Sequence, residues 1–394
     1  MPGTVLVVGA GVFGVTSALE LAERGWQVTL LDQGPAPHPL AASTDISKMI
    51  RADYGDDEHY IELMELAFPG WREWNRRWGT DLFHETGFLI LAGGPMEPGG
   101  FEHSSFEVLA GRGYPVESLA HDDIRAHYPA WRPPAGVEGY LSPVAGWAES
   151  GAVVQRLLGE ARQAGVEIRT GSAAELLIDG SAVGGVRLGP EEVIEREVTL
   201  VAAGAWTIDL VPSTTDLIST VGQPVIHFQP EDPEAFRPPA FPPWAADIGT
   251  LGWYGFPATE AGVVKVANHG AGRELPPDAE RLVGDRWEKL FREFLAGWIP
   301  SLAEAPVAAD RLCLYTDTTD GDFLIDRHPD LSGLVLATGG SGHGFKFAPV
   351  LGGLAADAVE GRDNSFLDRF RWRTATESRT EAARGTGPSP TADL

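Results

Sequence analysis

The sequence predicts a two-domain α/β protein, in which a discontinuous domain of mainly parallel strands is combined with a second, mainly antiparallel β-sheet domain. Two observations predict the first domain. Short apolar β-type runs alternate with helical patterns, and two of these runs, one near each end of the chain, lead directly into Gly-rich loops. The second domain is predicted from the intervening stretches, which are rich in Pro and Trp and contain alternating strand patterns.

The first unit lies at the N-terminus. An apolar run, Thr4–Val8, precedes a helical pattern, and a second β-type run from Trp26 ends at Asp32. Between run and helix stands a Gly-x-Gly-x-x-Gly motif made by Gly9, Gly11 and Gly14. In a Rossmann-type unit the first two glycines let the backbone approach a pyrophosphate and the third lets helix and strand pack closely, while the acid accepts hydrogen bonds from ribose. The motif predicts dinucleotide binding, and it leaves NAD and FAD open.

Further elements of the same domain are expected later in the chain. They are a helix at 153–164, strands at 166–169 and 198–203 with a glycine turn at 204–206, and a strand at 334–337 followed by a Gly-rich loop at 339–344 and a helix at 348–359. We therefore expect the nucleotide domain at 1–80, 146–220 and 311–373, and the substrate domain at 81–145 and 221–310. Residues 374–394 lack apolar periodicity and are predicted to be disordered.

Composition excludes several classes of protein. With 56 acidic and 30 basic residues the formal net charge is -26, which repels nucleic acid and anionic membrane surfaces. No apolar run of about 18 residues, the length that a membrane helix needs, is free of Gly or charge, and no signal peptide is evident. We expect a cytoplasmic protein. The single cysteine, Cys313, excludes an internal disulfide, and no metal-ligand spacing occurs, so no metal is expected.

Lysine is scarce, since only Lys48, Lys265, Lys289 and Lys346 occur among the 30 basic residues. Arg and Lys differ in pKa, hydration and geometry, so the few retained lysines are candidates for chemistry. Lys265 stands in an apolar strand pattern at 262–267, where a buried charge is costly. Because strands alternate faces, a second interpretation, in which Lys265 points outward to water, stays open.

Three segments near the C-terminus carry a specific resemblance. Residues 311–316 (Arg-Leu-Cys-Leu-Tyr-Thr), 322–326 and 341–347 (Ser-Gly-His-Gly-Phe-Lys-Phe) resemble the monomeric sarcosine oxidase family, which groups with fructosyl-amino-acid and N-methyltryptophan oxidases in the D-amino-acid oxidase superfamily. The likeness extends to Ile50-Arg51, to 254–257, to Lys265 and to His269. It implies FAD joined through a thioether from the flavin 8α-methyl carbon to Cys313. Without the flanking motif, a small buried hydrophobe is the usual fate of a lone cysteine.

The resemblance also implies roles for individual residues. Lys346 and Arg51 are expected to hold the substrate carboxylate, which a guanidinium binds well in a bidentate pair. Lys265 is expected to activate oxygen, and His269 and Tyr254 to orient the amine. The C-terminal glycine loop, through Gly340, Gly342, His343, Gly344 and Lys346, is expected to contact the flavin, with His343 capping the backbone or the cofactor. The competing interpretations are a solvated loop charge for Lys346, a structural salt bridge for Arg51, and satisfied core residues for His269 and Tyr254.

Two positions depart from the pattern of sarcosine oxidases. Lys48 stands where they usually carry Arg, so that 45–48 (Asp-Ile-Ser-Lys) is more similar to the Asp-x-Asn-Lys element of fructosyl-amino-acid oxidases. Ser43 and Thr44 occupy the place of an active-site His and are counted as cofactor-binding candidates, while Lys48 is counted with the catalytic candidates. These departures put sarcosine itself in doubt, and the substrate is predicted only as a class.

We therefore expect a monomeric FAD-dependent oxidase of the C–N bond of an N-substituted amino acid or small amine. It would use oxygen and yield an imine, then an aldehyde or ketone, an amine and hydrogen peroxide. The alternatives are a non-covalent D-amino-acid or glycine oxidase, an amine dehydrogenase that is poor with oxygen, a nicotinamide-dependent dehydrogenase, and a flavin-binding subunit without turnover of its own.

Overall fold

The computed structural model describes residues 3–374 and 383–385. Its first sheet has six strands in the order β20-β21-β13-β1-β2-β9, of which the last five run parallel and β20 pairs antiparallel at one edge. The strands are β1 (Thr4–Val8), β2 (Gln27–Asp32), β9 (Glu167–Thr170), β13 (Val198–Val201), β20 (Leu324–Arg327) and β21 (Leu334–Thr338). The predicted α/β class is confirmed, and the strands expected from the sequence pair in one sheet although they come from three distant parts of the chain.

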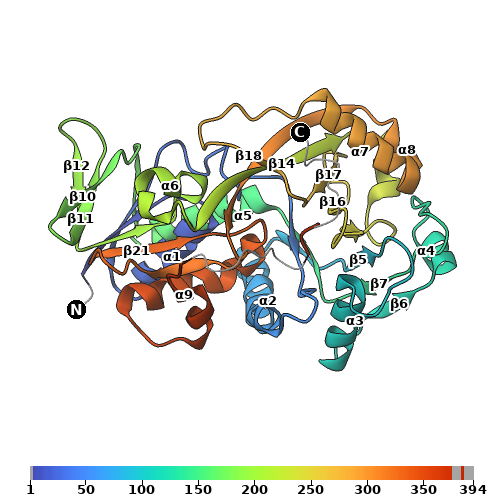
Figure 1. Ribbon diagram of the computed structural model, residues 1–394, viewed down its shortest axis with the longest axis horizontal. Helices are drawn as coiled ribbons and strands as arrows, with labels where there is room; N and C mark the ends of the chain where they lie inside the picture. Colours follow the sequence, from blue (N-terminus) through green and yellow to red (C-terminus); the bar gives the residue numbers. More distant parts are fainter. Residues whose placement is uncertain (1–2, 375–382, 386–394) are drawn as a thin grey trace.

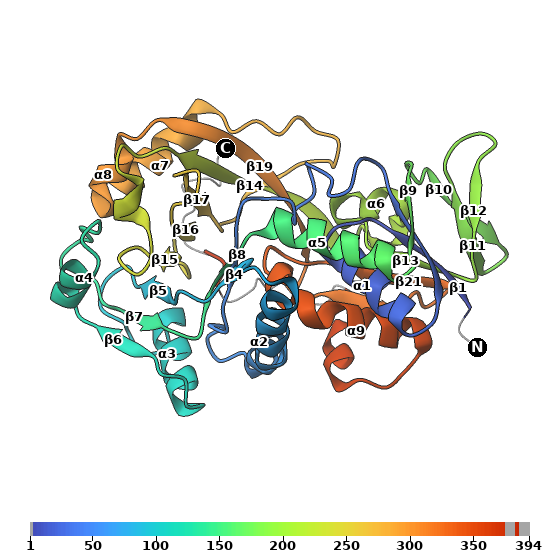
Figure 2. The same cartoon turned by 180° about the vertical axis from the view of Figure 1, so that it is seen from behind.

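Both faces of this sheet are covered, as its apolar strands require. On β1, Val5 and Val7 pack into a helical core, whereas Leu6 and Val8 pack into a second cluster on the opposite face. Figure 2 shows α1 (Val12–Glu23), α5 (Ser150–Gln163) and α9 (Ala348–Glu360) together on the helical face. The other face carries α6 (Thr207–Leu210) and a small sheet of β10 (Glu175–Asp179), β11 (Ala182–Arg187) and β12 (Val193–Glu195).

The second sheet has nine strands and is antiparallel except where β15 runs parallel to β5. Its strands are β5 (Phe88–Leu91), β6 (Glu117–Leu119), β7 (Gly139–Ser142), β14 (Ile218–Phe228), β15 (Trp244–Ala246), β16 (Trp253–Phe256), β17 (Val264–Asn268), β18 (Arg273–Glu274) and β19 (Val307–Thr318). Figure 1 shows this sheet beside the first one, with α7 (Asp285–Trp298) and α8 (Pro300–Ala303) over its outer side.

The two faces of the second sheet have different roles. Its outer face forms an aromatic core in which Trp244, Trp253, Phe294 and Trp298 stack or meet edge to face under α7. This core accounts for the Trp-rich composition of the predicted second domain. Since side chains alternate along a strand, Ala245, Tyr254 and Lys265 point to the opposite, inner face, toward the first sheet. Lys265 is 1% exposed, so the interpretation that it points outward to water is wrong.

Smaller elements complete the fold. A sheet of β3 (Lys48–Ile50), β8 (Gly146–Ala148) and β4 (Phe83–His84) lies beside α2 (Glu58–Trp78), and α3 (Phe101–Gly111) and α4 (His121–His127) flank the second sheet. Five 3-10 segments are η1 (Gly204–Trp206), η2 (Pro212–Thr214), η3 (Pro233–Phe236), η4 (Gly344–Phe347) and η5 (Ser365–Phe370). The glycine turn expected at 204–206 is therefore a helical turn.

Two findings differ from the boundaries that the sequence suggested. Strand β19, which includes Cys313, pairs along its length with β14 in the second sheet, so the expected boundary at residue 311 falls inside a strand of that sheet. In the segment expected to be disordered, Ala383 and Arg384 are buried against the second sheet. Residues 375–382 and 386–394 of that segment lie outside the described residues. The division into domains stays a prediction.

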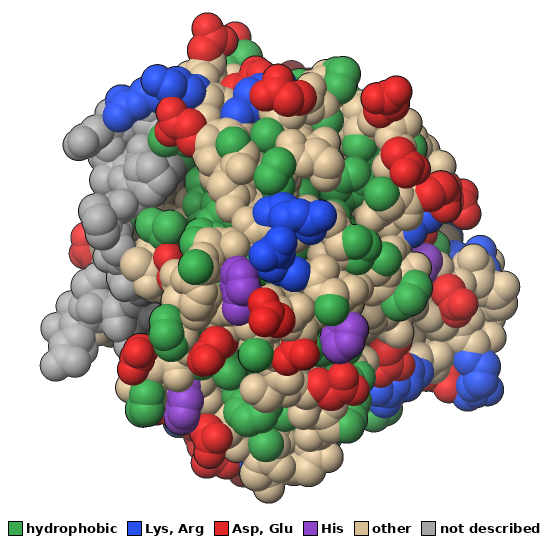
Figure 3. All heavy atoms as spheres, turned by 90° about the vertical axis from the view of Figure 1, so that its right-hand side faces the viewer, with side chains coloured by type: hydrophobic (Ala, Val, Ile, Leu, Met, Phe, Trp, Pro, Cys, Tyr) green, Lys and Arg blue, Asp and Glu red, His purple; other side chains and the backbone are tan. Residues whose placement is uncertain are grey.

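Acidic side chains are scattered over the end of the molecule that carries α4, α7 and α8, and basic side chains lie among them, with one basic cluster near the centre of the view (Figure 3). Within residues 3–374 and 383–385, no helix combines the length and apolar character needed to cross a bilayer. The same residues contain no group of three or more His, Cys, Asp or Glu arranged to hold a metal ion.

Candidate active site

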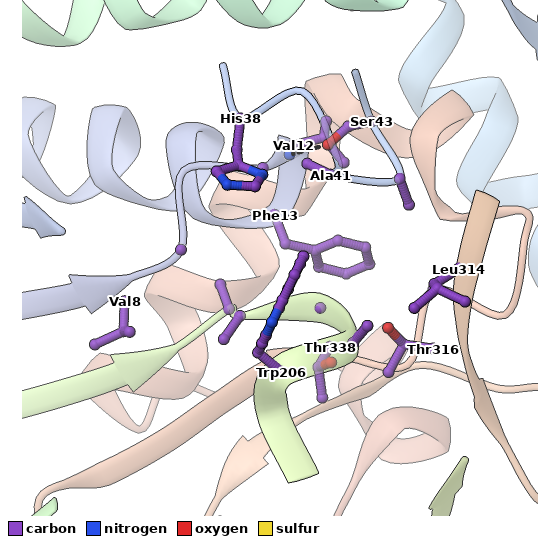
Figure 4. A pocket seen from close by; sticks show the side chains of 18 of the residues that line it. Val8, Val12, Phe13, His38, Ala41, Ser43, Trp206, Leu314, Thr316 and Thr338 are labelled. Atoms are coloured by element: carbon purple, nitrogen blue, oxygen red, sulfur yellow. Dashed lines mark hydrogen bonds between the residues drawn. The ribbon is translucent and has the colours of Figure 1, made fainter. Parts of the chain in front are cut away.

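A large cavity that opens to solvent lies at the carboxyl ends of the parallel strands. Its lining includes the residues at or just beyond the ends of four of them: Val8 and Gly9, Asp32, Ala202 and Thr338. Ligands of open parallel sheets bind at this edge. Figure 4 shows Phe13, His38, Trp206 and Thr316 around the cavity.

The N-terminal glycine motif shapes the cavity as predicted. Gly9 has a φ of +102°, and a Cβ there would lie 2.4 Å from the carbonyl oxygen of Ala202. A Cβ on Gly14 would lie 1.7 Å from the carbonyl oxygen of Gly9, so only glycine lets α1 begin this close to β1. The first turn of α1 contains no acidic residue, so its N-terminus remains attractive to a phosphate.

The acid at the end of β2 closes the motif. Asp32 Oδ2 accepts a hydrogen bond from the Ala10 amide at 2.7 Å, and its Oδ1 accepts one from the Gly34 amide at 3.2 Å. Ser43, from the following loop, accepts a hydrogen bond from the Val12 amide at 3.0 Å, which Figure 4 marks with a dashed line. Ser43 and Asp32 both line the cavity, whereas Thr44 beside Ser43 does not.

A second, smaller cavity adjoins the first. Lys48, Tyr315, Gly342 and Phe345 line both cavities and therefore lie at their boundary. Gly342 has a φ of +77°, and a Cβ there would lie 2.3 Å from the Tyr315 ring. The C-terminal glycine loop thus reaches the boundary: Gly340 and Gly344 line the first cavity and His343 the second.

Arg51 and Lys346, the expected carboxylate clamp, both line the second cavity and share one neighbour, Tyr54. The Arg51 guanidinium lies 5.2 Å and the Lys346 ammonium 4.9 Å from the centroid of the Tyr54 ring. Lys346 Nζ also donates to the Tyr54 hydroxyl at 2.8 Å and to the carbonyl of His343 at 3.1 Å. Tyr54 is 1% exposed, so it fixes the position of both cations relative to one another.

The hydrogen bonds around Tyr54 also fix the state of His343. His343 Nε2 lies 3.0 Å from the carbonyl of Gly321, which only accepts, so this nitrogen carries a proton. His343 Nδ1 lies 2.9 Å from the Tyr54 hydroxyl, which accepts from Lys346 and has its own proton to give. The neutral Nε2–H tautomer satisfies every partner. The expectation that His343 caps the backbone or the cofactor stays a prediction.

Tyr254, Tyr315 and His269 also line the second cavity. The hydroxyls of Tyr254 and Tyr315 are 3.2 Å apart, and the His269 ring lies 5.7 Å from that of Tyr315. Burial raises the pKa of both tyrosines, that of Tyr315 well above its usual value. Both phenols therefore stay neutral and offer an O–H or a lone pair to a ligand.

Lys265 lines neither cavity and forms a buried ion pair with Asp45. Its Nζ lies 2.6 Å from Asp45 Oδ2 and 2.7 Å from the carbonyl oxygen of Ser47. Burial lowers the pKa of Lys265 to about 8, and Asp45 opposes this shift. Asp45 Oδ2 is also 3.4 Å from Lys48 Nζ. One buried carboxylate thus joins two lysines, and Lys48 carries the positive charge of the group to the boundary of the two cavities.

Cys313 is buried on β19 between residues of the site without lining either cavity. It packs with Tyr254 and Tyr315, and the next three residues of its strand, 314–316, line the first cavity. Burial lowers the pKa of Lys48, but the nearby Cys313 sulfur and Asp45 carboxylate outweigh this effect, so the pKa is raised overall. The thiol is therefore an electrostatic neighbour of the lysine at the cavity boundary.

Comparison with known proteins decides which dinucleotide this site serves. A family model described as FAD dependent oxidoreductase matches residues 4–358. The chain belongs to the FAD-dependent oxidoreductase family. This membership selects FAD over a nicotinamide cofactor, and the α/β fold expected for such a protein is confirmed.

Individual relatives of this FAD-dependent oxidoreductase share most of its length. It is 28% identical to monomeric sarcosine oxidase of Bacillus sp. (strain B-0618) over 88% of this chain and 90% of the relative. It is 26% identical to N-methyl-L-tryptophan oxidase of Yersinia pestis over 89% and 93%. The solved fructosamine oxidase of Aspergillus fumigatus (Amadoriase II) has a TM-score of 0.85 at 26% identity and covers 98% of this chain and 94% of its own.

The residues present fit FAD. The first cavity combines a glycine cradle that a Cβ would fill, a helix N-terminus without acids, and an acid at the end of β2. Sequence reasoning missed Tyr54, which stands three residues after Arg51, and Asp45, which it quoted only as part of a motif. An aromatic residue so close to a candidate cation carries no distinctive pattern, because aromatic residues are common in cores.

Proposed function

We propose that this FAD-dependent oxidoreductase oxidises the C–N bond of secondary-amine amino acids and passes the electrons to oxygen. One observation carries the proposal: two adjoining cavities share a boundary at Lys48, Tyr315 and Gly342, and two further cations, Arg51 and Lys346, line the smaller cavity alone. The names of the relatives support it, since they include a sarcosine oxidase, an N-methyltryptophan oxidase and a fructosamine oxidase.

The residues of the second cavity bind and orient the substrate. Arg51 and Lys346, held in place by Tyr54, take the carboxylate. The hydroxyls of Tyr254 and Tyr315 and the ring of His269 face the amine, which must be neutral so that its nitrogen lone pair is available. FAD, when bound, accepts the two electrons and the hydrogen of the Cα–H or N-alkyl C–H bond. The resulting imine is hydrolysed by water to an amine or amino acid and an aldehyde or ketone.

Oxygen reduction is assigned to the lysine pair. Two ammonium groups and one carboxylate leave the group of Lys48, Lys265 and Asp45 with a net positive charge, which stabilises the anion that forms when oxygen takes up an electron. In the proposal Lys48 places positive charge at the boundary of the two cavities. Lys265, which lines neither cavity, adds a second positive charge through its contact with Asp45. Hydrogen peroxide is the product.

Cys313 is proposed to hold FAD covalently through a thioether to the 8α-methyl carbon. Its position beside Tyr254 and Tyr315, directly before the three residues of β19 that line the first cavity, supports this proposal. The rival is a non-covalent oxidase of the same family, in which Cys313 is a buried filler. A monomeric state and a cytoplasmic location stay predictions of the sequence.

Acid precipitation of the purified holoenzyme separates the proposed attachment from its rival. We expect yellow colour to stay with the precipitate of the native protein and to wash out of Cys313→Ser, and mass spectrometry to find added flavin mass only in the native protein. Peroxide release with N-methyl, cyclic and glycated amino acids tests the activity itself. A protein that releases no peroxide with any of them, and whose flavin none of them reduces without oxygen, would sink the assignment as an oxidase.

A further inference from the structure

The second cavity has a charged end and an apolar end. Arg51 and Lys346 form the charged end, together with the polar groups of Tyr254 and His269. The apolar end is formed by Phe88, Ile90, Phe101, Ala245 and Ile248. These residues line only the second cavity, so they lie away from the boundary with the cofactor cavity. A ligand bound by its carboxylate therefore meets an apolar surface with part of its remaining structure.

The apolar end of the cavity lacks side chains that recognise sugars or a second acid. Among the described residues that line this cavity there is no Asp, Glu, Asn, Gln, Ser or Thr. A sugar hydroxyl or a second carboxylate placed against the apolar end would lose its water without gaining a partner, and each such buried polar group costs about 1–3 kcal/mol. A hydrocarbon group placed there gains by its burial instead.

The apolar end is a preformed face of the second sheet. On β5, Phe88 and Ile90 face the cavity while Leu89 and Leu91 pack into the aromatic core behind them. On the neighbouring strand β15, Ala245 pairs in register with Ile90 and also faces the cavity. Because both strands are pinned by Trp244 and other core residues on their other face, the wall cannot rearrange to present polar backbone groups.

Arg51, at the charged end, lies beside two residues of the apolar end. The Arg51 guanidinium lies 5.9 Å from the ring centroid of Phe88 and 5.9 Å from that of Phe101. In an α-amino acid the side chain leaves the carbon that bears the carboxylate. A carboxylate on Arg51 therefore places the side chain within reach of these two rings.

We infer that the substrate is a secondary α-amino acid with an apolar side chain larger than a hydrogen atom, such as an N-methyl derivative of leucine or phenylalanine. This inference rests on the proposed function and narrows it. Sarcosine has only hydrogen on its α-carbon and leaves the apolar end unfilled. Glycated amino acids bring several hydroxyls to a wall that has no partner for them.

The first experiment compares substrates on the holoenzyme. We expect kcat/KM for N-methyl-leucine to exceed that for sarcosine and for fructosyl-glycine by at least about tenfold, the discrimination that an apolar pocket achieves between side chains. N-methyl-serine and N-methyl-aspartate should be no better than sarcosine. A preference for sarcosine, for the glycated substrate or for a polar side chain would overturn the inference and leave the proposed function standing. Reduction of the flavin by none of these compounds would overturn both.

The second experiment measures binding without turnover. Acetate, butyrate and hexanoate are titrated into the holoenzyme, and the visible spectrum of the bound flavin reports the dissociation constant. We expect affinity to rise about threefold or more with each added methylene that fits. Ile90→Thr should flatten this dependence, while Ile178→Thr, which makes the same exchange at a side chain 53% exposed on β10, should preserve it. Affinity that does not change with chain length in the native protein contradicts the inference, even if Ile90→Thr fails to fold.

Discussion

At the scale of single residues, the site depends on how buried cations are kept charged. Lys346 and Lys265 are 4% and 1% exposed, and each is surrounded by oxygen atoms that accept its hydrogen bonds. Lys346 lines the second cavity, whereas Lys265 contacts Asp45 and lines neither the first nor the second cavity. Two lysines with similar burial thus have different surroundings, and the proposed function assigns them to different half-reactions.

We expect replacement of these two lysines to separate the half-reactions. Lys346→Met should slow anaerobic reduction of the flavin by substrate about 100-fold, because it removes a charged hydrogen bond to the carboxylate worth about 3 kcal/mol. Lys265→Met should slow reoxidation by oxygen by a similar factor, about 100-fold, and leave reduction nearly intact. Stopped-flow absorbance measures both rates.

Lys289→Met is the matched control, because the Lys289 side chain is 76% exposed on α7 and pairs with Glu293 at 3.8 Å. It should change neither rate by more than about twofold. Equal losses in both half-reactions for either buried lysine would contradict the proposed division of roles.

The pKa of Lys265 predicts how reoxidation depends on pH. Burial lowers this pKa to about 8, so the ammonium loses its proton as the pH rises through that value. If the charge assists oxygen reduction, the reoxidation rate should fall above about pH 8 in the native enzyme and show no such step in Lys265→Met.

The lowered pKa of Lys265 also makes the stability of the fold depend on pH. The unfolded chain keeps its lysine protonated up to its usual value, so this group raises the free energy of unfolding as the pH rises from about 8 toward about 10.5. Denaturant titrations of the native protein and Lys265→Met check this difference, which should be absent in the variant.

At the scale of elements, close contact between β1 and α1 builds the cofactor cavity. The contact is possible because neither Gly9 nor Gly14 carries a side chain where the backbone of a neighbouring segment passes. The same geometry aims the N-terminus of α1 at the cavity. Cofactor binding and the packing of this unit therefore depend on the same two residues.

Gly14→Ala should lower the free energy of unfolding by about 3 kcal/mol and weaken FAD binding, because the new methyl would overlap the carbonyl oxygen of Gly9. Calorimetry and the ratio of flavin to protein absorbance measure the two effects. Gly159→Ala is the matched control, since Gly159 lies in α5 with nothing within 4 Å of the added Cβ. In that position alanine should stabilise the helix by about 0.5–1 kcal/mol. A Gly14→Ala protein with native stability and full FAD would refute the packing account.

At the scale of the whole molecule, the chain returns near its C-terminus to the wall of the substrate cavity. Arg384 Nη1 lies 2.6 Å from Asp317 Oδ2, and its Nε donates to the carbonyl of Gly270 at 2.9 Å. Ala383 packs in the same cluster as Ile90, Ala245 and Ile248. A short C-terminal piece therefore joins β19, the loop after β17 and the apolar end of the cavity.

We expect Arg384→Leu to lower the free energy of unfolding by about 3 kcal/mol, since it removes one partner of a buried ion pair. The KM for substrate should rise as well, because the cavity wall loses its support. Arg371→Leu is the matched control: its pair with Asp368 is 2.6 Å long but about two-thirds exposed on both sides, so its loss should cost less than about 1 kcal/mol. Unfolding titrations and steady-state kinetics test both variants, and equal costs would contradict a structural role for Arg384.

The sequence by itself determined the local units of this protein. Strand, glycine loop and helix follow one another within a few residues at each end of the chain, and glycine spacing and apolar periodicity are properties of adjacent positions. The apolar residues next to Lys265 in the sequence likewise predicted that its charge would be buried and would need a partner. Family motifs added the expectation of FAD and pointed to Arg51 and Lys346, the two cationic side chains that line only the second cavity.

Only the tertiary structure decided which partners these residues receive. Asp45 meets Lys265 across 220 positions of sequence, and Tyr54 meets Lys346 across 292. It also decided that Cys313 belongs to the second sheet and that Arg384 is buried beside Asp317. Such contacts follow from which faces of the two sheets are turned toward one another, and that arrangement is set by the packing of both cores rather than by any local pattern.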